Sequence, residues 1–141
     1  MRPEAAPPEP ATSAAERSGR EALARLRRFG GDVLVRDMLA IFAEDAPVRL
    51  RAARAGVAAG DPAAVRLAAH SLKSSCAQFG AVVAAGLCDG AERAALRGDL
   101  APLPALLEDV ERELAAFLRW LEREIGATAA DRERAGGGGR A

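Results

Sequence analysis

Residues 60–80 read GDPAAVRLAAHSLKSSCAQFG and contain the start, the apolar face and the end of one helix. Gly60 suits the end of a preceding helix, Asp61 is a favourable N-cap, and Pro62 fits a first helical position. Gly80 marks the following turn. Between them, apolar residues recur at helical intervals, at Val65, Ala69, Leu72, Cys76 and Phe79. The stretch therefore predicts an amphipathic helix from Pro62 to about residue 79.

Four further helical patterns flank this helix, at about residues 18–29, 32–59, 81–97 and 100–125. Pro47 should kink the second pattern because it removes an intrahelical donor. The last pattern spaces its apolar residues four and three apart, as in a bundle seam, at Leu103, Leu107, Val110, Leu114, Phe117 and Leu121. Short connections force antiparallel neighbours. The predicted fold class is all-α, an antiparallel up-down four-helix bundle with a short extra N-terminal helix.

The two ends of the sequence have a different composition. Residues 1–17 are rich in Pro, Ala and Glu, and residues 126–141 end in AGGGGRA. Apart from Met1, neither end has a large apolar side chain, so neither should bury enough surface to fold. We expect a disordered segment over 1–17, one bundle domain over 18–125 and a disordered Gly-rich tail over 126–141.

Charge and composition limit the classes of partner. The 141 residues include 20 basic and 20 acidic ones, interspersed, which argues against nucleic acid or an anionic membrane and favours a protein partner. No apolar run is long enough to span a membrane, and no signal peptide is visible, so a cytoplasmic location is expected. Cys76 and Cys88 match no metal or disulfide pattern and are expected to be buried thiols. The chain is expected to be a monomer.

His70 is the only histidine and Lys73 the only lysine of the sequence. At 100° per residue, His70 lies about 140° from Val65, the first residue of the apolar stripe, so its imidazole should face solvent. It shares this side of the helix with Arg66, Leu67, Lys73, Ser74 and Ala77. An exposed histidine is commonly just a solvated side chain. The mid-helix position, the cation one turn on and the small neighbours favour accessible chemistry.

Residues 69–81, AHSLKSSCAQFGA, resemble the signature of histidine-containing phosphotransfer (HPt) domains, in which His-x-Leu-Lys-Gly/Ser precedes a glycine near the helix end. The resemblance covers about residues 20–122 and includes the Gly30-Gly31-Asp32 segment and the Gly60-Asp61 turn. Ser74 stands where many members have Gly, and Ala91-Glu92 where many have Leu-Glu.

The resemblance implies a phosphorelay intermediate. His70 would accept a phosphoryl group from a receiver-domain aspartyl phosphate and pass it to another receiver aspartate. Its partners would be response-regulator receiver domains and hybrid sensor kinases. The chain would be a phosphocarrier without kinase activity and without a cofactor of its own, since Mg²⁺ is expected in the partner receiver.

The neighbours of His70 receive roles under this hypothesis. Lys73 would act with His70 in catalysis by neutralising phosphoryl oxygens. The partner-binding residues would be Arg66, Leu67, Ser74, Ala77 and Gln78, with Leu67 and Ala77 as an apolar docking rim. Each of them could equally be an idle surface side chain.

Three other classes of protein are alternatives to this hypothesis. A docking module that regulates a receiver or kinase without being phosphorylated remains the alternative, although His70 and Lys73 argue against it. A metal or haem enzyme would need several inward-facing ligands. An ATP-dependent kinase would need a glycine-rich nucleotide loop, which the sequence lacks.

Overall fold

The structure, a computed structural model, describes residues 11–137, which form helices and short connections without any strand. The helices are α1 (Ala11–Ala58), α2 (Pro62–Gln78), α3 (Val82–Leu96) and α4 (Leu103–Gly137). Within α1, the backbone angles of Gly31 (φ 68°, ψ −164°) are not helical and separate two helical segments, residues 11–30 and 32–58. The predicted all-α fold class is confirmed.

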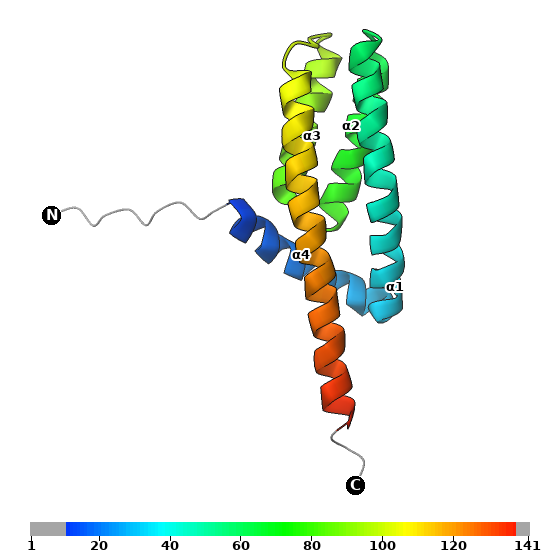
Figure 1. The fold of residues 1–141 in the computed structure, drawn as a ribbon, viewed down its shortest axis with the longest axis vertical. Coiled ribbons are helices and arrows are strands. Elements are labelled where there is room, and N and C mark those ends of the chain that lie inside the picture. Colours follow the sequence, from blue (N-terminus) through cyan, green and yellow to red (C-terminus); the bar gives the residue numbers. More distant parts are fainter. Residues whose placement is uncertain (1–10, 138–141) are drawn as a thin grey trace, which may run out of the picture.

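The second segment of α1 and the helices α2, α3 and α4 lie side by side and alternate in direction, while the first segment of α1 crosses one end of the bundle (Figure 1). Each helix packs against the next along the chain, and α4 closes the ring against α1. The bundle therefore has an α2–α3 face and, across the core from it, an α1–α4 face.

Local signals in the sequence account for both ends of α2 and for the break in α1. The Asp61 side chain accepts a hydrogen bond from the Ala64 backbone N–H (3.2 Å), which caps α2. Gly60 and Gly80 adopt positive φ angles of 64° and 74° at the two ends of α2. The helix break in α1 lies at Gly31, whereas Pro47 stays inside a helical stretch, so the kink expected at Pro47 does not interrupt the helix.

The core consists of the apolar stripes that the sequence predicts. All six seam residues of α4 are buried, and on α2 the predicted stripe is buried as well. Phe42 of α1 packs on Phe79 with ring centroids 5.0 Å apart. Along the described part of the chain, no helix is long and apolar enough to cross a membrane.

Within the described residues, parts of both ends that were predicted to be disordered are helical. Residues 11–17 are helical, and Ala15 is buried in the main core cluster. Residues 126–137 continue α4, with Arg134 paired to Asp131 at 3.1 Å. Ala, Arg and Glu favour helix, and an existing helix gains a hydrogen bond with each added residue, so it extends without burying apolar surface. Residues 1–10 and 138–141 lie outside the described residues.

Two glycines let the first segment of α1 approach the bundle closely. A Cβ atom on Gly19 would overlap the Trp120 ring, and one on Gly80 would overlap the backbone of Ser18. Arg20 lies over the Trp120 ring, 5.6 Å from its centroid, and pairs with Glu124 at 3.2 Å. The segment is thereby packed against α4 and against the turn between α2 and α3.

Gly80→Ala should therefore be much more destabilising than Gly60→Ala. A positive φ at a residue other than glycine costs about 1–3 kcal/mol. Both substitutions incur this cost, but only the methyl group at residue 80 meets the Ser18 backbone, since nothing lies within 4 Å of the corresponding position at residue 60. Urea unfolding of both variants measures the difference, and equal losses would show that the Ser18 contact is unimportant.

Candidate functional site

His70 lies in the middle of α2 with 59% of its side chain exposed. The prediction that it faces solvent is confirmed, because Val65, Ala69 and Leu72 occupy the buried side of the helix. The Ser74 hydroxyl donates to the backbone carbonyl of His70 (3.1 Å), one turn away. An accessible imidazole on a regular helix is thus the starting point of the site.

Glu92 of α3 fixes the orientation of this imidazole. Its Oε1 lies 3.0 Å from His70 Nδ1, and only 12% of the Glu92 side chain is exposed. A carboxylate can only accept hydrogen bonds, so the neutral ring carries its hydrogen on Nδ1. The lone pair is then on Nε2, which has no hydrogen-bond partner among the described residues.

Lys73 joins the same cluster from the next turn of α2. Its Nζ lies 2.6 Å from Glu92 Oε2 and 3.3 Å from Asp89 Oδ1. Glu92 Oε2 is buried and has no hydrogen-bond partner among the described residues. Its contact with Lys73 is therefore an ion pair and not a well-directed hydrogen bond. Asp89 is shared with the Arg93 guanidinium, 3.0 Å away. Charges of opposite sign therefore alternate from Glu92 to Arg93 along the α2–α3 face.

The pairing shifts both partners toward their charged forms. Lys73, and to a smaller extent His70, lower the pKa of the Glu92 carboxyl from its ordinary value of 4.5, although desolvation acts in the opposite direction. Glu92, followed by Asp89, raises the pKa of Lys73 above 10.5. Glu92 is therefore ionised and Lys73 protonated at neutral pH, so the carboxylate is available to accept from His70.

The proposed partner-binding residues are all exposed on α2: Arg66, Leu67, Ser74, Ala77 and Gln78. Leu67 is 65% exposed. Gln78 does not reach His70 and instead lines a shallow hollow with Ile41 and Asp45 of α1. Their roles in binding stay predictions.

Glu92 and Asp89 belong to the site but were not predicted from the sequence. The available signal was the spacing of Asp89, Glu92 and Arg93, three and four residues apart on one side of a helix. This spacing does not reveal that the side faces His70, because that depends on how α2 and α3 are aligned. The two cysteines are free and buried as expected.

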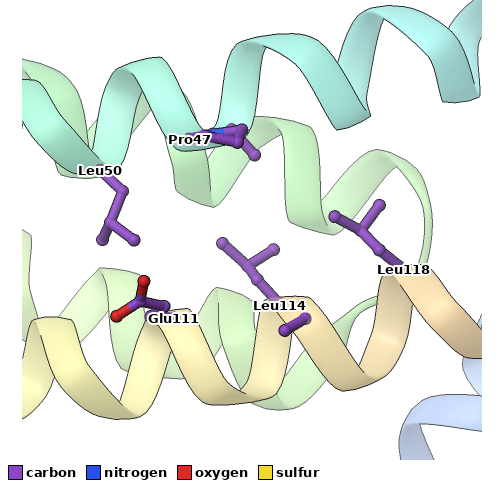
Figure 2. Close-up of a pocket in the computed structure, with 7 residues that line it drawn as sticks. Pro47, Leu50, Glu111, Leu114 and Leu118 are labelled. Carbon is purple, nitrogen blue, oxygen red and sulfur yellow. The ribbon is translucent and has the colours of Figure 1, made fainter.

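A pocket lies between α1 and α4 (Figure 2), whereas His70 lies on α2. Its lining is Ala46, Pro47, Leu50, Glu111, Leu114, Ala115 and Leu118. The pairing with Arg54 lowers the pKa of Glu111, the one ionisable residue of this lining. The lining contains no nucleophile, so the pocket offers no chemistry comparable to that of the α2–α3 face.

The sequence and the fold are similar to those of known proteins. Residues 37–120 match the Hpt domain family. The crystal structure of histidine-containing phosphotransfer protein B (HptB) from Pseudomonas aeruginosa PAO1 superimposes with a TM-score of 0.71 and 37% sequence identity, over 76% of this chain and 92% of that one. A search among curated proteins found no significant match.

The chain belongs to the Hpt domain family. Domains of this family are phosphocarriers that interact with response-regulator receiver domains, and membership supports a histidine phosphotransfer function in phosphorelays.

Lys73→Ala should raise the pKa of Glu92 toward 4.5, because the substitution removes the main cause of its depression. A depressed carboxyl pKa contributes stability above the ordinary glutamate value, and this contribution is lost as pH falls through the folded-state value. Acid unfolding of the variant should therefore begin at higher pH. Carbon-detected NMR titration of the Glu92 carboxyl measures the shift, and an unchanged pKa would contradict this role of Lys73.

Proposed function

We propose that this chain is a phosphorelay intermediate that receives a phosphoryl group on His70 Nε2 from a receiver aspartyl phosphate and transfers it to another receiver aspartate. The observation that carries the proposal is the exposed imidazole whose Nδ1 is bound to Glu92, 3.0 Å away. This contact leaves Nε2, the nitrogen with the lone pair, on the outside of the bundle.

In the forward step, the Nε2 lone pair attacks phosphorus, the P–N bond forms and the bond from phosphorus to the aspartyl oxygen breaks. The aspartate leaves as a carboxylate. The ring acquires positive charge, and the Glu92 carboxylate at Nδ1 stabilises it. The same geometry serves the reverse step, in which a receiver aspartate attacks phosphorus and His70 leaves as the neutral ring.

Phosphoryl transfer needs mainly in-line positioning and neutralisation of charge. We expect the receiver to supply Mg²⁺ and the acidic pocket, so that this chain contributes a nucleophile and needs no cofactor of its own. It is then a carrier without intrinsic kinase activity. The proposal includes a cytoplasmic location and a monomeric chain.

The surface around His70 suits a protein partner that must reach Nε2. Ser74 and Ala77 are small, which leaves clearance for a receiver beside the imidazole. Leu67 on α2 and Ile41 on α1 are 65% and 67% exposed and offer apolar contacts. Arg66, exposed one turn before His70, is available for acidic groups at the rim of the receiver pocket.

The proposal is tested by incubating the chain with a panel of receiver domains carrying labelled aspartyl phosphate. The wild-type chain should acquire acid-labile label, and His70→Gln should acquire none, because the amide cannot act as the nucleophile. Binding of the same receivers to His70→Gln, measured by titration calorimetry, serves as the control that the surface is intact.

Label on the His70→Gln variant would contradict the proposal. Binding of receivers by the wild-type chain without any transfer of label would also contradict it, and would favour a docking module that is not phosphorylated.

A further inference from the structure

Two cysteines lie on the inner side of α2 and α3. Cys76 is 0% and Cys88 1% exposed, and both belong to the main core cluster. The ion pair between Lys73 and Asp89 marks how the two helices are aligned. Cys76 lies one turn after Lys73 on α2. Cys88 directly precedes Asp89 on α3, and this alignment brings the two thiols within hydrogen-bonding reach of each other.

We propose that Cys76 and Cys88 form an oxidation site: when α3 opens locally, a peroxide converts the two thiols to a disulfide that links α2 to α3. The inference does not rest on phosphotransfer, because it concerns two side chains that the proposed function does not use. Disulfides that form in a reducing compartment are usually transient and serve in catalysis or redox sensing. The free thiols are then the resting state of the pair.

The two thiols have different roles because their surroundings differ. Cys76 donates its hydrogen to the sulfur of Cys88, which lowers the pKa of Cys88 from its ordinary value of 9.0. Desolvation acts in the opposite direction, and the positive charge of Lys73 again lowers this pKa. The same hydrogen bond, followed by burial, raises the pKa of Cys76. Because the thiolate is the nucleophile, Cys88 is the sulfur that attacks the oxidant.

The reaction with hydrogen peroxide proceeds in two steps. The Cys88 thiolate attacks one peroxide oxygen, the O–O bond breaks, and the leaving hydroxide takes up the proton that Cys88 released, which gives water. Cys88 is now a sulfenic acid. The Cys76 sulfur then attacks the Cys88 sulfur, the S–S bond forms and the S–O bond breaks. The hydroxyl group leaves with the Cys76 proton as a second water, so the thiols are oxidised and the peroxide is reduced.

The sequence of α3 favours the opening that lets the oxidant reach Cys88. Gly86 and Gly90 flank Cys88, and glycine is among the least favourable residues inside a helix. Packing does not require these glycines. A Cβ atom on Gly86 would meet nothing within 4 Å, and one on Gly90 would only touch Leu106 Cδ2 at 4.0 Å. Their effect is to lower the free energy of local opening around the buried thiol.

The first test uses the unmodified chain. The reduced protein is treated with hydrogen peroxide until glutathione in the same solution is fully oxidised, then alkylated in denaturant and analysed by mass spectrometry. The chain should have lost both free thiols and two hydrogens, with Cys76 linked to Cys88 in the peptide map, and dithiothreitol should restore both thiols. Two alkylated cysteines after peroxide, or a link between two chains, would overturn the proposal.

A matched pair of variants tests which sulfur attacks. Cys76→Ser keeps a hydroxyl donor beside Cys88, so the Cys88 sulfenic acid should accumulate and react with dimedone. Cys88→Ser should give no dimedone adduct on Cys76. Adducts of equal yield, or an adduct on Cys76 alone, would contradict the assignment of Cys88 as the nucleophile. Circular dichroism establishes that both variants are folded.

A second pair of variants tests the local opening of α3. Gly86→Ala should slow disulfide formation by about fivefold, which corresponds to the difference in helix propensity between glycine and alanine. Gly126→Ala is the control, because it adds the same methyl group to open space on α4. It should leave the rate unchanged. Equal rates for wild type and Gly86→Ala would contradict oxidation through this opening, and none of these measurements depends on whether His70 is phosphorylated.

Discussion

The antiparallel packing of α2 on α3 is the constraint on which the site depends. It brings His70, on one helix, opposite Glu92, on the other, with Nδ1 and Oε1 3.0 Å apart. A histidine alone on a helix would rotate freely between rotamers and tautomers. The neighbouring helix selects one arrangement, in which the ring is exposed and its Nδ1 is occupied. The orientation of a single side chain is thus set by the alignment of two helices.

That alignment is supported at the turn between α2 and α3. The turn between α2 and α3 uses the positive φ of Gly80, and the first segment of α1 packs directly against this turn. On the other side of the same segment, Gly19 lies against the Trp120 ring of α4. The first segment of α1 therefore contacts both the α2–α3 turn and α4. Its contribution to the site is indirect, through the position of α3.

Local signals made most of the fold predictable. The cap at Asp61, the glycines after each helix and the four-three spacing on α4 are short-range features, and the structure agrees with them. The exposure of His70 followed from helical geometry alone. The extents of α1 and α4 could not be predicted in this way. Composition indicates whether a segment can build a core, but not whether the segment extends an existing helix.

The acidic half of the site needed information that no single helix contains. Asp89 and Glu92 read as an ordinary charged helix side until α3 is placed against α2, and only then does Glu92 meet His70 and Lys73. The same placement changes the interpretation of Lys73. In sequence it is a cation one turn from a histidine, whereas in the structure it is the counter-ion of the carboxylate that holds that histidine.

The central claim is tested most directly by identifying which nitrogen of His70 accepts the phosphoryl group. The chain labelled with ¹⁵N-histidine can be phosphorylated by a receiver or by phosphoramidate, a small phosphoryl donor, and examined by nitrogen–phosphorus coupling. Because Glu92 occupies Nδ1, the coupling should appear on His70 Nε2. A phosphoryl group on Nδ1, or on any residue other than His70, would contradict the arrangement of the site.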